Sequence, residues 1–396
     1  MISEKMKPLV NNNSAIRAMF EEGSRMAAEY GSENVYDFSL GNPNVPAPPE
    51  VKDAILDIIE NEDPHKVHGY MSNAGFEETR DAIAQNLNER FGTSYEAKNV
   101  IMTVGAGSAL NVILKTILDP DDEILVLAPY FVEYKNYIGN YFGRTVEVKT
   151  DENSGFLPDM EKIRAAITPK TKGIIINNPN NPTGVVYPES VIRELAGVLE
   201  EKQKEYGSVI YLISDEPYRE LVYGGAVVPF LPKYYDNTIV GYSFSKSLSL
   251  PGERIGYILV PDEADGAEEF LSAATIANRV SGAVNAPSLM QLVIARCLNA
   301  KVDVDYYARN GKDLYDGLTD AGFQCVVPQG AFYLWVKSPV ADEKQFVEAG
   351  KKHHILMVPG SSFAGPGYVR LSFCVSHEMI ERSMPAFRAL ASEYFG

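Results

Sequence analysis

The sequence predicts an α/β protein with a mostly parallel sheet covered by helices on both faces, followed by a smaller α+β domain. Two observations carry this prediction. Strand-length apolar runs recur between residues 99 and 243, and helical segments separate most of them. Beyond residue 260 the pattern changes to long helices followed by short strands. Continuous apolar strands that alternate with helices are typical of a parallel sheet buried on both faces.

The first of these regions supplies six strands and four helices. Strands are predicted at residues 100–104, 123–128, 144–148, 173–177, 209–214 and 238–243. Helices are predicted at residues 107–118, 131–141, 158–167 and 188–206. Ligands of such sheets bind outside the carboxyl ends of the strands. The residues that follow each strand are therefore the first place to look for a site.

The remaining elements follow residue 260. Helices are predicted at residues 262–278, 286–299 and 301–319, strands at 323–327, 332–337, 355–358 and 368–374, and a last helix from about 377. An amphipathic helix is predicted over residues 14–30. We expect residues 1–48 to form an N-terminal segment that joins the small domain, residues 49–290 the large domain, and residues 291–396 the small C-terminal domain.

Composition narrows the class of protein. A length of 396 residues with 45% hydrophobic content suffices for two domains, and a net charge of −17 argues against nucleic acid or anionic membrane as the main partner. The cysteines, Cys297, Cys325 and Cys374, are odd in number and far apart, which predicts a reducing compartment. No signal-peptide core or membrane-length apolar run occurs, so we expect a cytoplasmic protein. His65 and His68 lack a third ligand nearby, and no metal is expected.

A glycine turn follows the first predicted strand. Gly105, Ala106 and Gly107 open a helix, and such a turn frees backbone N–H groups that favour a phosphate. The turn is not a dinucleotide fingerprint, because Leu110 stands where the third glycine would be.

The later strand ends carry an aromatic pair, an amide-rich loop, a carboxylate and a lysine. Tyr130 and Phe131 follow the second strand, the Asn/Pro-rich loop 177–184 follows the fourth, Asp215 follows the fifth and Lys246 follows the sixth. Each has an ordinary structural explanation when taken alone, such as core packing for the aromatic rings or a solvated loop position for the lysine. Together they suit a flat phosphorylated heteroaromatic aldehyde, and pyridoxal phosphate is that molecule.

The chain resembles the fold-type I pyridoxal-phosphate enzymes, specifically the class I/II aminotransferases of the aspartate aminotransferase superfamily. The resemblance runs from the segment Leu40-Gly-Asn-Pro-Asn to Tyr368-Val-Arg-Leu-Ser-Phe373. It rests on the ordered set Asn-Pro-x-Asn-Pro-Thr-Gly, Asp-x-x-Tyr, and Ser-x-Ser-Lys with an arginine eight residues after the lysine. It implies a seven-stranded sheet, pyridoxal phosphate as cofactor, and transfer of an amino group between an L-amino acid and a 2-oxo acid in a ping-pong cycle.

The resemblance also implies roles for the catalytic residues. Lys246 resembles the lysine that forms the Schiff base and carries the Cα proton, and Asp215 resembles the carboxylate paired with the pyridine nitrogen. An ionised carboxylate at that place keeps the ring nitrogen protonated, which draws electrons from the substrate Cα. Tyr218 and Asn181 resemble the pair that binds the 3′-oxygen of the ring.

The remaining implied roles concern phosphate, ring and substrate. Phe131 is at the ring-stacking position, and Tyr70 resembles a tyrosine that reaches the phosphate of the neighbouring subunit, which implies a homodimer. Arg370 resembles the clamp for the substrate α-carboxylate, with help from Gly41 and Asn181. The phosphate-binding group is implied to be Gly105, Ala106, Gly107, Ser243, Ser245 and Arg254.

Several alternatives stay open at this point. A lyase of the β-lyase or decarboxylase type on the same scaffold is the main alternative to a transaminase. Ser243-Phe-Ser-Lys246 also fits S-x-x-K of penicillin-recognising hydrolases, but their S-D-N and K-T-G motifs are absent from the sequence. Tyr333 is expected in the core of the small domain more than at the substrate. Gly107 replaces a lysine of some aspartate-using relatives, which places aspartate specificity in doubt.

Overall fold

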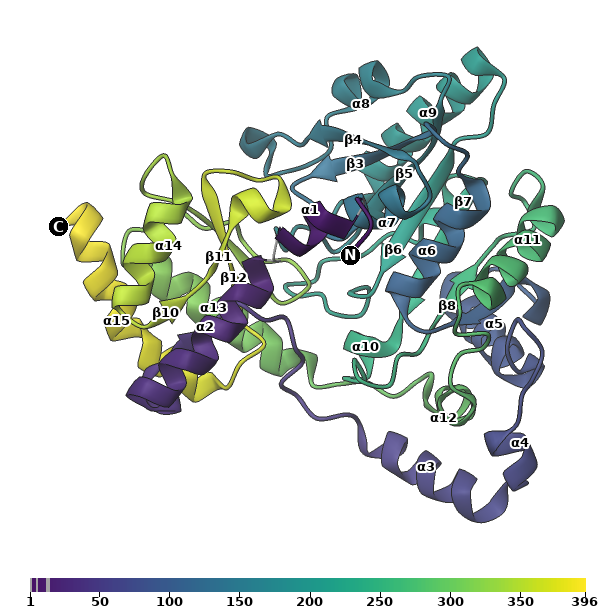
Figure 1. Cartoon of the computed structure of the whole chain (residues 1–396), viewed down its shortest axis with the longest axis horizontal. Coiled ribbons are helices and arrows are strands. Elements are labelled where there is room, and N and C mark those ends of the chain that lie inside the picture. The colour runs from purple at the N-terminus through teal and green to yellow at the C-terminus, as the bar shows by residue number, and fades with distance from the viewer. Residues whose placement is uncertain (1, 5, 12–14) are drawn as a thin grey trace.

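The large domain is built on a seven-stranded sheet. The computed structural model describes residues 2–4, 6–11 and 15–396, and Figure 1 shows the sheet in the teal half of the molecule. The strand order is β2-β8-β7-β6-β5-β3-β4. The strands are β2 (Val100–Thr103), β3 (Glu123–Ala128), β4 (Arg144–Lys149), β5 (Thr171–Asn177), β6 (Tyr211–Glu216), β7 (Thr238–Ser243) and β8 (Gly256–Leu259).

The strand directions agree with the predicted sheet. β3, β4, β5, β6 and β7 pair in parallel, whereas β8 is antiparallel to both β2 and β7. All six predicted strands are present, and the mostly parallel seven-stranded sheet is confirmed. β8 is the strand that the sequence analysis did not predict, because it follows the loop of residues 248–255 and so falls outside the alternation of strands and longer helices.

Helices cover both faces because alternate strand residues point to opposite sides. Ile124, Val126 and Ile213 pack against the face formed by α6 (Ala106–Ile117), α7 (Tyr134–Asn140) and α11 (Ala267–Val280). Their neighbours Leu125 and Leu212 pack against the opposite face, which α8 (Met160–Ala166) and α9 (Glu189–Tyr206) cover. Burial on both faces explains why these strands are continuously apolar.

The β2–β8 end of the sheet is covered by helices that the sequence analysis had not assigned. These are α3 (Pro49–Asn61), α4 (Pro64–His68) and α5 (Glu77–Phe91), which pack with α12 (Ser288–Cys297). α5 buries polar residues such as Thr79 and Asn86 beside its apolar ones. Its apolar periodicity is weak for that reason.

The small domain combines helices with a three-stranded antiparallel sheet of order β11-β12-β9 (Figure 1). Its elements are α13 (Val304–Asp320), β9 (Tyr333–Lys337), α14 (Glu343–Lys352), β10 (Ile355–Leu356), β11 (Val358–Pro359), β12 (Tyr368–Ser372) and α15 (His377–Phe395). The strand predicted at 323–327 is only a single bridge from Cys325 to Val336. The run at 355–358 is split between β10 and β11.

The N-terminal segment packs onto the small domain. β1 (Tyr36–Asp37) pairs in parallel with β10, and Phe38 belongs to the buried cluster of that domain. α1 (Met6–Asn11) precedes α2 (Ala15–Tyr30), which matches the helix predicted at 14–30 except that residue 14 lies outside the described residues. The domain boundaries at 48/49 and 290/291 stay a prediction.

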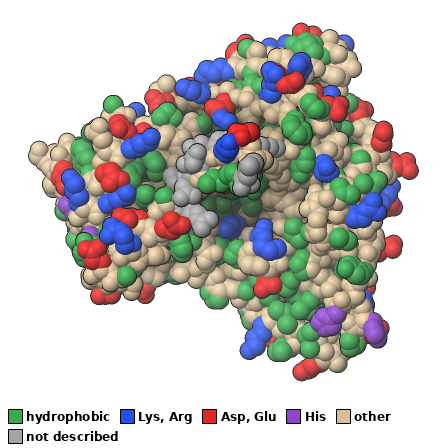
Figure 2. All heavy atoms as spheres, in the orientation of Figure 1, with side chains coloured by type: hydrophobic (Ala, Val, Ile, Leu, Met, Phe, Trp, Pro, Cys, Tyr) green, Lys and Arg blue, Asp and Glu red, His purple; other side chains and the backbone are tan. Residues whose placement is uncertain are grey.

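The carboxyl ends of the parallel strands converge where the two domains meet. Asn177 and Asp215 are register partners, and Asp215 is next to Gly241 of β7. The visible face is hollowed in this region, with Lys or Arg side chains in and beside the hollow (Figure 2). Among the described helices, none is long and apolar enough to cross a membrane.

Candidate active site

One cavity of about 350 Å³ gathers most of the predicted site residues at the carboxyl edge of the sheet. It is bounded by the large domain, by residues 40 and 41 of the N-terminal segment, and by the small domain through Tyr333 and Arg370. The predicted residues in its lining are Gly41, Ala106, Gly107, Phe131, Asn181, Asp215, Tyr218, Ser243, Ser245, Lys246, Arg254 and Arg370.

Lys246 lies on α10 (Phe244–Ser247), directly after β7. The Ser243 side chain caps this short helix by accepting a hydrogen bond from the Ser245 N–H at 3.2 Å. The Lys246 ammonium donates to the Gly41 carbonyl at 2.9 Å. The pKa of Lys246 is lowered to about 8, mainly by burial; Cys374 opposes this shift, and the nearby cations Arg370 and Arg254 add smaller lowering effects. A buried lysine of this kind has an unprotonated, nucleophilic fraction near neutral pH.

Asp215 is buried at the end of β6 with one oxygen held and the other free. Its Oδ2 accepts a hydrogen bond from the Tyr134 hydroxyl at 2.5 Å, and its Oδ1 is buried without a hydrogen-bond partner in the described part of the chain. Burial raises the pKa of Asp215 to about 7, although the Tyr134 hydrogen bond opposes the rise. An orphaned buried carboxylate oxygen is costly, and a cationic N–H donor placed in the cavity would satisfy it.

The amide loop and two tyrosines form the next side of the cavity. Asn177 accepts from the Asn181 backbone N–H at 2.7 Å and donates to the Asp215 carbonyl at 3.0 Å, which ties the loop to β6. The Tyr218 and Tyr333 hydroxyls lie 3.0 Å apart. Tyr333, expected mainly in the core, is buried and also lines the cavity.

Arg370 is a buried cation without a carboxylate partner among the described residues. It donates from Nη1 to Asn181 Oδ1 at 3.0 Å and from Nη2 to the Ser39 carbonyl at 2.9 Å, while its Nε has no hydrogen-bond partner within the described ranges. Its guanidinium lies over the Tyr333 and Phe363 rings, 4.2 and 4.6 Å from their centroids. A buried charge is stable only when it is compensated, so this geometry calls for an anion from outside the chain.

The glycine turn and Arg254 form a second anion-binding group. Gly105 caps α6 with φ of 87°, and the first turn of that helix has backbone N–H groups without intrahelical partners. Arg254 is held by the carbonyls of Pro251 and Val104 at 2.8 and 3.2 Å. A Cβ on Gly105 would lie 2.8 Å from Arg254 Nη2, so glycine is required for this close approach. Gly105 itself is outside the cavity lining.

The donor set fits pyridoxal phosphate. Lys246 offers an amine for the aldehyde, and the free Asp215 Oδ1 offers an acceptor for the protonated ring nitrogen. Phe131 supplies a ring face, while Arg254 and the α6 N-terminus supply phosphate donors. Each end of the cofactor therefore has a group of matching chemistry, although the binding roles themselves remain a prediction.

Tyr70 lies apart from this cavity. It is 93% exposed and lines a different depression, with His68 and Met71 among its neighbours.

Tyr134 and Asn177 are the site residues whose roles the sequence analysis missed. Asn177 belongs to the predicted loop 177–184, and Tyr134 follows the aromatic pair Tyr130 and Phe131, but their contacts with Asp215 could not be predicted from spacing. No group of three or more His, Cys, Asp or Glu residues suited to a metal occurs in the described part of the chain.

Comparisons with known proteins agree with this geometry. The sequence model of the family "Aminotransferase class I and II" matches residues 32–387. The aspartate/prephenate aminotransferase of Thermus thermophilus is 35% identical over 355 residues, which are 88% of this chain and 89% of that protein. Among solved structures, an aminotransferase from Eubacterium rectale has 47% identity and a TM-score of 0.97, covering 100% of both chains.

A second solved structure comes from another organism. The aspartate aminotransferase of Thermus thermophilus with maleate has 30% identity and a TM-score of 0.87, covering 98% of this chain and 100% of that one. The family match spans most of the sequence and the structural likeness spans all of it. The chain therefore belongs to the class I and II aminotransferases and is a pyridoxal-phosphate-dependent aminotransferase.

Proposed function

We propose that Lys246 anchors the cofactor covalently and carries the proton of the transamination, while Arg370 binds the α-carboxylate of the substrate. The observation that carries this proposal is the buried Arg370 guanidinium, which has no carboxylate partner in the described chain and faces the same cavity as Lys246. A 2-amino acid and a 2-oxo acid both present one carboxylate beside the reacting carbon. Arg370 can therefore hold the substrates of both half-reactions in turn.

The cofactor, when bound, supplies an aldehyde that exchanges amines and a ring that withdraws electrons from the substrate Cα. The chain supplies the rest. Asp215, paired through Oδ1 with the ring nitrogen, would keep that nitrogen protonated. Its Oδ2 stays fixed by Tyr134. Tyr218 and the Asn181 amide NH₂ group would bind the 3′-oxygen, because the Asn181 oxygen is already used by Arg370.

Lys246 is placed to move a proton once a substrate amine has displaced it. Its lowered pKa leaves an appreciable unprotonated fraction near neutral pH, so it can act as a base at the Cα and then return the proton as an acid. Arg254, the serines Ser243 and Ser245, and the turn of residues 105–107 would hold the phosphate throughout the cycle.

The substrate side chain would contact Gly107 and its surroundings. A Cβ on Gly107 would lie 3.0 Å from the Tyr137 hydroxyl, so Tyr137 covers the place where some aspartate-using relatives carry a lysine. The cations in the cavity lining are Lys246, Arg254 and Arg370, and each already has a proposed partner. We therefore propose that this chain prefers donors with an uncharged side chain over aspartate.

We further propose a cytoplasmic homodimer. The three cysteines are free, which suits a reducing compartment. Tyr70 is highly exposed and lies apart from the active-site cavity of its own chain, which supports its proposed role at the phosphate of a neighbouring subunit. Sedimentation of the holoenzyme should give twice the chain mass, and Tyr70→Phe should weaken cofactor affinity without changing that mass.

The decisive experiment is a single half-reaction. Purified holoenzyme mixed with one L-amino acid and no oxo acid should change its visible spectrum and release one equivalent of 2-oxo acid per chain, without ammonia. Continued turnover with ammonia release would show a lyase instead. Lys246→Arg should lose the visible response, whereas Lys98→Arg, a surface lysine paired with Asp262, should keep it. The donor that reacts fastest identifies the substrate class, and fastest reaction with aspartate would refute the proposed preference.

A further inference from the structure

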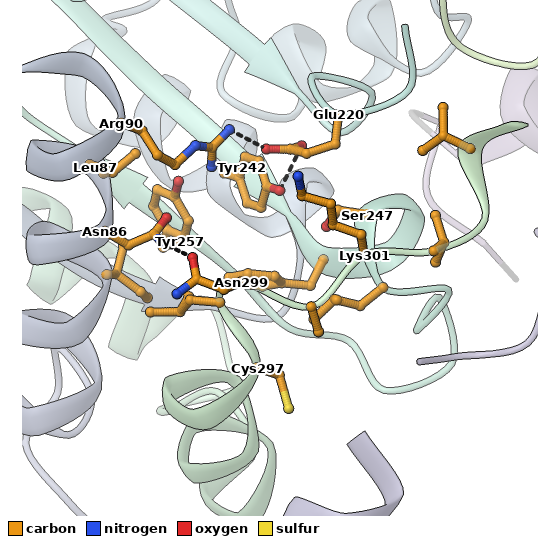
Figure 3. A pocket seen from close by; sticks show the side chains of 17 residues that line it. Asn86, Leu87, Arg90, Glu220, Tyr242, Ser247, Tyr257, Cys297, Asn299 and Lys301 are labelled. Carbon is orange, nitrogen blue, oxygen red and sulfur yellow. Dashed lines mark hydrogen bonds and ion pairs between the residues drawn. The ribbon is translucent and has the colours of Figure 1, made fainter. Parts of the chain in front are cut away.

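A second cavity, of about 480 Å³, lies behind the helix that carries Lys246 (Figure 3). It is larger than the active-site cavity and lies within the range of about 300–1,000 Å³ that is typical of small-molecule sites. Its walls come from α5, from β7 and β8, from α10, and from the connection between α12 and α13. None of the predicted cofactor or substrate residues lines it.

The α10 segment separates the two cavities. Ser243, Ser245 and Lys246 face the active site, whereas Phe244, Ser247 and Leu248 line the second cavity. A molecule in the second cavity would thus contact the reverse side of the helix that holds the catalytic lysine.

One side of the second cavity is polar. Arg90 and Tyr242 both donate to Glu220, each at 2.8 Å, and Lys301 points toward this group in Figure 3. Lys301 forms no ion pair with any described residue, so two cations face one carboxylate and an excess positive charge remains. The Ser247 hydroxyl is also buried here, near Tyr242, and no described residue lies within normal hydrogen-bond distance of it.

The rest of the lining is largely apolar, with Ile83, Leu87, Phe244, Leu248, Leu298 and Val302 around the polar side. We propose that this cavity is a second binding site, for a small monocarboxylate with an aromatic or branched apolar body. Its carboxylate pairs with the Lys301 ammonium and accepts a hydrogen bond from the Ser247 hydroxyl. Its apolar body packs against the leucine, isoleucine and valine side chains.

Such a ligand would connect two parts that meet at the active site. Besides α10, it contacts the connection of residues 298–304, which leads into α13. On α13 the Tyr307 hydroxyl accepts hydrogen bonds from the backbone N–H groups of Asn44 and Val45, both at 3.2 Å. These residues follow Gly41, whose carbonyl binds Lys246. Occupancy is therefore expected to change the environment of Lys246 from both sides.

The test is a calorimetric titration of holoenzyme with 3-phenylpropionate after its active site has been blocked by aminooxyacetate. The blocking reagent reacts with the cofactor aldehyde and places its own carboxylate at Arg370. Any 3-phenylpropionate that still binds must therefore occupy a site outside the active-site cavity. We expect one equivalent per chain. The neutral analogue 3-phenylpropionamide should bind at least about fivefold more weakly, because it forms no ion pair.

Two variants locate the binding. Ala300→Phe places a ring in the cavity and should abolish the titration, and Lys301→Gln should weaken it about fivefold by removing the cation. The matched control Lys98→Gln removes a surface lysine outside the cavity and should leave it unchanged. The proposal is overturned if the blocked enzyme binds no 3-phenylpropionate, or if both cavity variants bind it as tightly as the native chain.

Discussion

Replacing Asp215 with asparagine should change how the stability of the cofactor-free protein depends on pH. The carboxyl is buried with Oδ1 unsatisfied, and burial raises its pKa from the ordinary 3.8 to about 7. In the unfolded chain the group ionises at its ordinary pKa. Between these two pKa values the folded state keeps a proton that the unfolded state has lost, so the free energy of unfolding falls as pH rises.

The magnitude follows from the two pKa values. At about 1.4 kcal/mol for each pKa unit, the full penalty above pH 7 is about 4 kcal/mol. About 2.5 kcal/mol of this penalty develops between about pH 5 and pH 8. Asp215→Asn keeps the shape and can still accept from Tyr134, but it does not ionise. The variant should therefore gain about 2.5 kcal/mol relative to the native apoprotein over that pH interval.

Urea unfolding of both apoproteins at the two pH values measures this difference directly. If the native-minus-variant difference in the free energy of unfolding is the same at both, the carboxyl ionises normally and the argument is refuted. Adding pyridoxal phosphate at about pH 8 should stabilise the native chain more than the variant. A protonated ring nitrogen would compensate the Asp215 carboxylate, which only the native chain has. Tyr134→Phe, which removes the hydrogen bond that favours ionisation, should widen the pH effect.

Three further predictions concern neighbouring parts of the site. The rate at which apoprotein attaches the cofactor covalently, measured by visible absorbance, should rise about tenfold per pH unit up to pH 8 and then level off, because neutral Lys246 would be the nucleophile. A rate that continues to rise up to pH 10 would contradict the lowered pKa. Gly105→Ala should weaken cofactor affinity at least about tenfold in equilibrium dialysis, since residue 105 has a positive φ and the new Cβ would crowd Arg254. The control Gly197→Ala has open space around it and should leave the affinity unchanged. Tyr333→Phe removes the 3.0 Å contact with Tyr218 and should lower kcat/KM about two- to tenfold; unchanged kinetics would make Tyr333 purely structural.

The apolar runs of the sequence were sufficient to predict most of the sheet. Strands buried on both faces, such as β3, are recognisable locally, because their central residues are apolar whatever their partners are. β8 falls outside the alternation of strands and helices, and the buried face of α5 includes the polar residues Thr79 and Asn86. Their placement depends on the neighbours that they meet after folding.

Part of the candidate site could likewise be predicted from the sequence, and part of it could not. Twelve of the fourteen predicted site residues line one cavity, because the carboxyl ends of parallel strands meet at one edge of the sheet. Tyr134 was missed because its bond to Asp215 joins residues 81 positions apart, and no local pattern records that pairing. Tyr333 was expected in the core, and the structure shows that it is buried and also faces the cavity.

The sequence by itself determined the fold class and the cofactor, and it predicts the lysine that meets this cofactor, since each depends on residue types at the ends of recognisable strands. Only the tertiary structure decided that, among the described residues, Arg370 has no counter-ion and one oxygen of Asp215 has no hydrogen-bond partner, and that α10 has a second cavity behind it. The contacts of Arg370 with Asn181 and Ser39 span 189 and 331 positions. Charge compensation and empty volume arise from what surrounds a side chain in space, and that arrangement exists only once the chain has folded.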